Sequence, residues 1–163
     1  MELHTQWPKI KKFFEKTFYS SFHYAIATVD KDGFPHVSPI GSLMLTETGK
    51  GLYFEKFTKK IPENLTQNQK ICVMAIDTNR FFLLWSFITG RFAHPPAIRL
   101  TGLAGKRRPP TEAELKKFYR RVRHLKFYKG HHLLWQNMPI VRDICFDRME
   151  LVKIGAMTEG ISL

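Results

Sequence analysis

Apolar positions near the start of the chain recur at helical spacing. Over residues 7–18 they fall on one side of a helix, with lysines between them, and Pro8 is acceptable in a first turn. The residues of this apolar side are Ile10, Phe13, Phe14 and Phe18. The pattern predicts an N-terminal amphipathic helix.

From residue 23 the pattern changes to β-branched and aromatic residues on both sides of a polar segment. The segment contains Asp32-Gly33, which is typical of a tight hairpin turn. Two antiparallel strands are therefore expected around it. Pro35 and Pro39 lack the amide hydrogen that a central strand donates, so the second strand should lie at an edge, be bulged or be interrupted.

Further strands follow in the middle of the chain. TETGKG (46–51) has the composition of a turn and LYFEKF (52–57) that of the returning strand. Residues 58–68 are a short helix candidate and residues 70–77 a strand. RFFLLWSFITGRF (80–92) and PAIRLTGLAGKR (96–107) are interpreted as two more strands, joined around His94-Pro95-Pro96.

The clearest helix spans residues 111–126. Thr111 and Glu114 have the spacing of a capping box after two prolines. One apolar stripe follows, formed by Leu115, Phe118, Tyr119, Val122 and Leu125. A last strand is expected within residues 142–157. This order predicts one mainly-β domain over residues 1–163, a small antiparallel barrel with added helices.

Composition adds limits to this fold class. The 163 residues are 44% hydrophobic and 13% aromatic, which excludes a disordered chain. No apolar stretch is long enough to span a bilayer, and the start does not have the pattern of a secretory signal. Cys72 and Cys145 lie in apolar runs without metal-site spacing, so they are expected to be reduced and buried. A cytoplasmic protein is the simplest expectation, with no membrane partner.

The formal net charge of +12 favours anionic partners. Basic residues are dense before and within residues 111–126, where a solvated face is the first interpretation and an anionic ligand the second. Nucleic acid is the last, because Phe118 and Tyr119 belong to the apolar stripe and are expected in the core instead of stacking on bases.

Positive charge also gathers where a strand meets the short helix. Lys56, Lys59 and Lys60 lie beside Thr58 at the start of residues 58–68. Lysines at a helix N-terminus oppose the helix dipole, at a cost of about 0.3–1 kcal/mol each, whereas an anion there is stabilised. The turn is either a phosphate site or a solvated loop, and the residues alone leave both open.

Three segments carry a resemblance to a known family. ATVDKDGFPHVSPI, GLYFEKFTKK and NLTQNQKICVMAI, within residues 22–76, resemble the pyridoxamine 5′-phosphate oxidase-like flavin-binding split-barrel family. Two positions differ from the family pattern. Ile61 stands where many relatives have a basic residue, and Gln69 where a proline is common.

The resemblance implies a six-stranded antiparallel split barrel that forms a homodimer with FMN at the subunit interface. Residues 37–45 would lie along the isoalloxazine ring, and the lysine turn would bind the phosphate. From aromatic character alone, Trp85 or Trp135 is expected to cover the flavin from the partner subunit, with core or dimer-interface packing as the alternative. The implied cofactor-binding residues are Pro39, Ile40, Gly41, Ser42, Phe54, Lys56, Phe57, Thr58, Lys59 and Lys60.

The same resemblance limits the activity. True pyridoxamine phosphate oxidases carry Arg-x-Val-Leu-Leu-Lys on the second strand and Trp-Gly-Gly near the C-terminus, and both are missing here. The expectation is an FMN-dependent oxidoreductase of unknown substrate, supplied with electrons by a reduced nicotinamide or by a small molecule. The residues indicate no catalytic side chain. A non-catalytic flavin- or haem-binding protein is the alternative, and a basic nucleic-acid-binding protein is a less favoured one.

The haem alternative depends on histidines that could ligate the iron. Some split-barrel relatives bind haem, and His94, His131 or His132 would then ligate the iron. A resident metal ion is not expected. His131 and His132 are expected on a strand, where neighbouring side chains point to opposite faces, and no carboxylate or cysteine nearby completes a ligand set.

Overall fold

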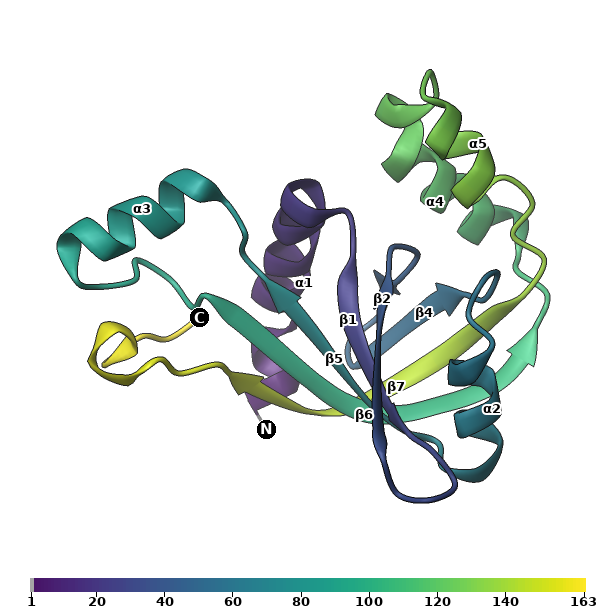
Figure 1. Cartoon of the computed structure of the whole chain (residues 1–163), viewed down its shortest axis with the longest axis horizontal. Coiled ribbons are helices and arrows are strands. Elements are labelled where there is room, and N and C mark those ends of the chain that lie inside the picture. Colours follow the sequence, from purple (N-terminus) through teal and green to yellow (C-terminus); the bar gives the residue numbers. More distant parts are fainter. Residues whose placement is uncertain (1) are drawn as a thin grey trace.

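The computed structural model describes residues 2–163, and their strands form one curled antiparallel sheet (Figure 1). The hairpin around Gly33 starts it: Gly33 has φ +87°, and Tyr24 to Val29 pair in register with Ile40 to Pro35. In spatial order the strands are β2 (Pro35–Ile40), β1 (Tyr24–Val29), β5 (Lys70–Ile76), β6 (Ala97–Arg108), β7 (Val141–Leu151), β4 (Lys50–Phe54) and β3 (Met44–Leu45). The proline-containing strand β2 lies at an edge, as predicted.

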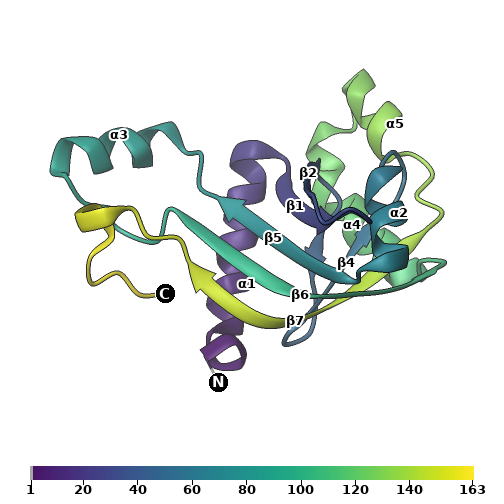
Figure 2. The same cartoon turned by 60° about the horizontal axis from the view of Figure 1, so that its bottom comes forward.

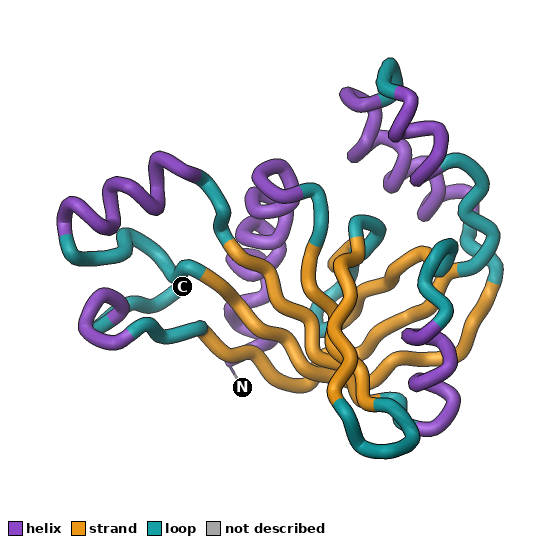
Figure 3. Tube along the Cα trace, viewed as in Figure 1, coloured by secondary structure: helices purple, strands orange, loops and turns teal. Residues whose placement is uncertain are grey.

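The two longest strands, β6 and β7, bend the sheet into a half-barrel (Figure 3). Their pairing shifts register between Thr101 and Gly102, and again after Ala104. A Cβ at Gly102 would lie 2.1 Å from the backbone oxygen of Cys145, so only glycine fits this bulge. The predicted split-barrel class is confirmed. The sheet has seven strands instead of six, because a bend at residues 41–43 separates β2 from the two-residue β3.

Helix α1 (Glu2–Ser21) packs along one face of the sheet (Figure 2). Its buried side is Leu3, Trp7, Ile10, Phe13, Phe14 and Phe18. The helix is longer than predicted, and Pro8 lies in its interior instead of its first turn. Pro8 removes one backbone hydrogen bond there. Leu3 and Trp7 on the far side of the proline are both buried in the core, and this burial offsets the loss.

The prediction of a strand over residues 80–92 was wrong, because this segment forms helix α3 (Arg80–Thr89). The Asn79 side chain caps it by accepting hydrogen bonds from the backbone N–H groups of Phe81 and Phe82, and Gly90 ends it in the left-handed conformation. A short apolar run does not distinguish helix from strand by periodicity. The capping residues Asn79 and Gly90, at the two ends of this run, are the features that indicate a helix.

The remaining helices lie near the two ends of the sheet (Figure 1). They are α2 (Lys60–Gln67), α4 (Glu112–Val122), a 3₁₀ turn (Arg123–Leu125), α5 (Lys129–Trp135) and a last 3₁₀ turn (Gly155–Thr158). The predicted capping box of α4 is confirmed in both directions. Phe118 is fully buried, but Tyr119 is 36% exposed, so the prediction of a core position holds for Phe118 alone.

Two other predictions need correction. His131 and His132 lie on helix α5 and not on a strand, so their rings contact each other edge-to-face, with centroids 5.5 Å apart. Cys145 is exposed and Cys72 only half-buried, although both are free thiols as expected. Side chains alternate along a strand, and Cys145 lies between the buried Ile144 and Phe146. Among residues 2–163, no helix is long and apolar enough to cross a membrane.

Candidate cofactor cavity

A cavity of about 550 Å³ opens between the end of α1, the bend after β2, the turn before α2 and the inner side of α5. This volume lies in the range of small-molecule and cofactor sites, about 300–1,000 Å³. Its lining is mainly apolar and aromatic with a few polar groups. The lining residues are Ser21, Phe22, His23, Pro39, Ile40, Gly41, Ser42, Phe54, Lys56, Phe57, Thr58, Leu125, Tyr128, Gly130, His131, Leu134, Trp135 and Met138.

The bend after β2 is held in place by Ser42. Its hydroxyl donates to the Phe54 carbonyl at 2.9 Å and accepts from the Phe54 N–H at 3.1 Å, which joins the bend to β4. Gly41 fills a tight position, because a Cβ there would lie 2.9 Å from the Phe22 carbonyl oxygen and 3.8 Å from Nε1 of Trp135. The Ser42 hydroxyl is therefore structural, and the bend offers a ligand mainly its backbone and the ring of Pro39.

Glu55 anchors the turn that leads into α2. Its buried carboxylate accepts hydrogen bonds from Arg142 at 2.7 Å, from the Tyr53 hydroxyl at 2.7 Å and from Arg107. Burial alone would raise the pKa of Glu55, but the hydrogen bonds from Arg142, Tyr53 and Arg107 outweigh it and lower the pKa. The charged network fixes the backbone from which residues 56–59 enter the cavity.

Thr58 presents a polar atom that the protein leaves unused. Its Oγ1 is buried and has no hydrogen-bond partner among the described residues, and Thr58 lines the cavity. A buried hydroxyl without a partner costs free energy unless a ligand or water completes it. The atom therefore marks a place where a polar ligand group fits.

The three lysines of this turn have different environments. Lys56 donates to the Leu133 and Gln136 carbonyls at the C-terminal end of α5, and so ties the turn to that helix. Lys60 pairs with Glu63 at 3.0 Å. Within residues 2–163, Lys59 has no ion pair or hydrogen bond from its side chain. The α5 carbonyls and Glu63 thus offset part of the positive charge that a bound anion was expected to offset.

Helix α5 forms the opposite wall. Trp135 is almost fully buried and packs edge-to-face against His131, with ring centroids 5.5 Å apart. Nδ1 of His131 is buried without a hydrogen-bond partner among the described residues. Desolvation first, and then the neighbouring His132, lower the pKa of His131, so its imidazole is neutral at pH 7.

The structure brings together most of the residues expected at the site. Those that line the cavity are Pro39, Ile40, Gly41, Ser42, Phe54, Lys56, Phe57 and Thr58. Lys59 and Lys60 lie outside the lining. Trp135 lines the cavity, but Trp85 lies on α3, at the other end of the molecule, and is 63% exposed (Figure 1).

The structure also reduces the number of histidines that could ligate a haem iron in this cavity. His94 lies away from the cavity, where it is 3.5 Å from the buried Asp77 carboxylate and stacked on Phe82 with centroids 4.0 Å apart. His131 faces the cavity. Among residues 2–163, no group of three histidine, cysteine or acidic side chains is arranged to hold a metal ion.

Apart from Trp135 and His131, the α5 side of the cavity was missed by sequence reasoning. Leu125, Tyr128, Leu134 and Met138 are common apolar residues with no motif, and Phe22 lies at the turn between α1 and β1. Phe22 has φ +59°, a strained conformation for an aromatic residue. It places its carbonyl oxygen against Gly41 at the rim of the site.

Comparison with known proteins agrees with this geometry. The family model described as pyridoxamine 5′-phosphate oxidase matches residues 8–141, most of the chain. The chain belongs to this family. Among proteins with curated descriptions, none matches the chain.

Solved structures share the fold at low identity. HupZ of Group A Streptococcus is 18% identical, covers 92% of this chain and 96% of its own, and has a TM-score of 0.58. An FMN-binding protein of Syntrophomonas wolfei is 13% identical, with coverages of 92% and 94% and a TM-score of 0.60. HutZ, a haem storage protein of Vibrio cholerae, is 16% identical, with coverages of 93% and 95% and a TM-score of 0.53.

Proposed function

We propose that this protein binds FMN in the cavity between β2, α2 and α5. The observation that carries the proposal is the buried hydroxyl of Thr58, which has no hydrogen-bond partner among the described residues and lines a mainly apolar cavity, with Lys59 next to it in the sequence. A phosphate there would accept from the hydroxyl and offset the charge of the turn. The FMN-binding relative with the same fold supports this choice of cofactor.

The residues around the cavity suit the parts of a flavin. Pro39 to Ser42 would lie along the ring, with the backbone of the bend as the source of polar contacts, and Trp135 would exclude water at its rim. When bound, FMN supplies hydride or single-electron transfer. A reduced nicotinamide or another small reduced molecule is the electron source that we propose, which makes the protein an FMN-dependent oxidoreductase.

The proposed assembly is a homodimer with FMN at the subunit interface, as the family resemblance implies. The cavity is open along one side, and Phe57 at its edge is 61% exposed. A second subunit would cover such an edge. Sedimentation velocity should then give about 38 kDa, twice the chain mass of 19.1 kDa, and a single-chain mass would contradict the dimer.

The experiment that tests the site is an FMN titration of Thr58→Val. Loss of one hydrogen bond to a charged group costs about 1.5–3 kcal/mol, so affinity should fall by about ten- to a hundred-fold. Stability should not fall, because the hydroxyl has no protein partner to lose. Flavin fluorescence quenching measures the binding.

The matched control is Thr66→Val on α2, the helix that follows the turn containing Thr58. Its hydroxyl donates to the Glu63 carbonyl and lies outside the cavity. FMN affinity should stay unchanged in this variant. Equal FMN binding by Thr58→Val and the wild type would remove the hydroxyl from the phosphate site.

A specific observation favours haem as the second candidate. The neutral imidazole of His131 faces the cavity with a buried nitrogen that has no partner, and a haem storage protein shares the fold. Haemin added to the protein would give a sharp Soret band, lost in His131→Ala and kept in His132→Ala. A Soret band that survives in His131→Ala would exclude His131 as the ligand of the haem iron.

A further inference from the structure

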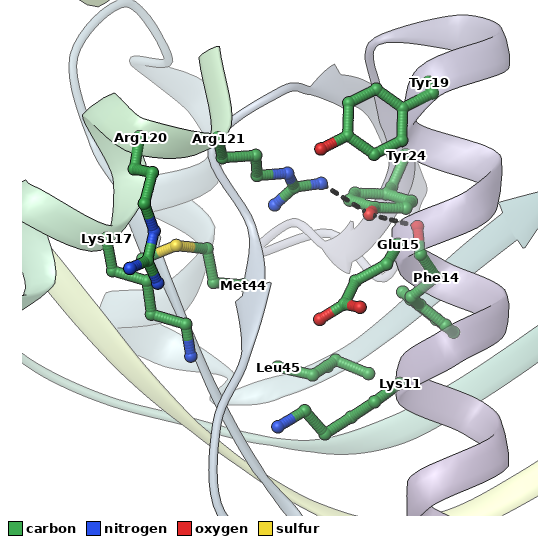
Figure 4. Close-up of a pocket in the computed structure, with 10 residues that line it drawn as sticks. All are labelled: Lys11, Phe14, Glu15, Tyr19, Tyr24, Met44, Leu45, Lys117, Arg120 and Arg121. Carbon is green, nitrogen blue, oxygen red and sulfur yellow. Dashed lines mark hydrogen bonds between the residues drawn. The ribbon is translucent and has the colours of Figure 1, made fainter. Parts of the chain in front are cut away.

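A second, smaller cavity of about 240 Å³ lies between α1 and α4 (Figure 4). Lys11, Glu15 and Tyr19 project into it from successive turns of α1. Lys117, Arg120 and Arg121 enter from α4 on the opposite side, and Met44 and Leu45 of β3 form part of its floor. It shares no lining residue with the cofactor cavity.

Arg121 is the most firmly held of these cations. Its guanidinium donates to the Tyr24 hydroxyl at 2.6 Å and to the Leu43 carbonyl, and lies 3.5 Å from the centre of the Phe18 ring. Tyr24 in turn donates to the Phe14 carbonyl at 2.6 Å (Figure 4). Both acceptors of Arg121 are therefore neutral, and a guanidinium has five N–H donors, more than these two bonds use.

The charge of this pocket is not balanced by the protein. Four cations line it, and Glu15 is its single carboxylate. Within residues 2–163, none of these five side chains forms an ion pair. Burial also lowers the pKa of Arg121, which reflects the cost of holding its charge away from water. Helix α4 thus contributes three cations, while α1 contributes one cation and one carboxylate, so the concave space keeps an excess of positive charge.

We propose that this pocket binds a small phosphomonoester with an apolar body. A dianionic phosphate would bridge Arg121 to the cations of both helices, in the bidentate geometry that guanidinium groups favour. The apolar body would rest on Phe14, Met44 and Leu45. The pocket is concave and too small for a polymer, so a free small molecule suits it better than nucleic acid. The site is independent of the proposed flavin cavity.

Calorimetric titration with phenyl phosphate tests the proposal, with phenol as the uncharged probe. The Lys117→Gln/Arg120→Gln variant changes two exposed residues at the rim, so it should fold normally. Phenyl phosphate should bind the wild type and bind this variant at least about ten-fold more weakly, because two charge-assisted contacts are lost. Phenol should not bind measurably to either protein.

The matched control is Lys116→Gln/Arg123→Gln, which removes the same charge from exposed positions outside the pocket. Its affinity for phenyl phosphate should equal that of the wild type. An equal loss in both variants would show a diffuse surface effect and overturn the proposal, as would no binding at millimolar concentration. Thr58→Val should retain full binding, and a loss there would assign the phosphate to the flavin cavity instead.

Discussion

The buried carboxylate of Glu55 shows how single residues set the entrance of the cofactor cavity. It begins the turn before α2 and joins β4 to β6 and β7 through Arg107 and Arg142. Arg142 is nearly as buried as Glu55, so each charge depends on the other. Sequence reasoning did not single out Glu55, because its partners are 52 and 87 residues away along the chain.

Glu55→Ala should destabilise the fold by about 3–5 kcal/mol, because it leaves the Arg142 guanidinium buried without a counter-charge. The exposed pair of Arg99 and Glu150 provides a control, and Glu150→Ala should cost at most about 1 kcal/mol. Urea unfolding measures both free energies. A loss below 1 kcal/mol for Glu55→Ala would show that the network does not stabilise the sheet.

At the scale of elements, sequence reasoning predicted the features that depend on interactions between residues close together in the chain. The Asp32-Gly33 hairpin and the capping box of α4 were both read correctly, because each depends on hydrogen bonds within a few residues. Helix α3 was missed, since its apolar run suits either helix or strand and its caps were overlooked. Residues 39–42, 54 and 56–58 were found, and Trp135 and His131 were named as candidates. The rest of the α5 side was not found, because the contact of α5 with Lys56 spans 77–80 residues and carries no motif.

The start of α4 should make stability depend on pH. Arg108 first, and then the backbone of Thr111, hold the pKa of Glu114 at about 2, below its ordinary value of 4.5. A carboxyl with a depressed folded-state pKa stabilises the fold above its unfolded pKa, and this is lost as the pH falls from about 4.5 towards 2. Because the pair is partly exposed, we expect about 1 kcal/mol. Glu114→Gln should flatten the urea stability profile over this window, and an unchanged slope would contradict it.

The bulge between β6 and β7 gives a second prediction for an element. Gly102→Ala should destabilise the fold by about 3 kcal/mol or more, because the added methyl group would meet the Cys145 backbone. Gly130→Ala on α5 meets nothing within 4 Å and should be neutral or slightly stabilising. Thermal unfolding compares the two. Equal stability of both variants would mean that the strands move apart at little cost.

At the scale of the whole molecule, one fold holds two sites of different character. The larger cavity is apolar with an unused hydroxyl, and the smaller one is basic with an apolar floor. The net charge of +12 suggested anionic ligands from the outset, but only the fold shows where cations from separate helices meet. Residues 11 and 121 are too far apart in sequence for any local pattern to relate them.

The visible absorption spectrum tests the central claim most directly. Purified protein is incubated with FMN, desalted and scanned, with Thr58→Val treated in parallel. The account predicts a retained two-band flavin spectrum for the wild type and a weaker one for the variant. A wild-type protein that emerges colourless after FMN has been offered would contradict the flavin site.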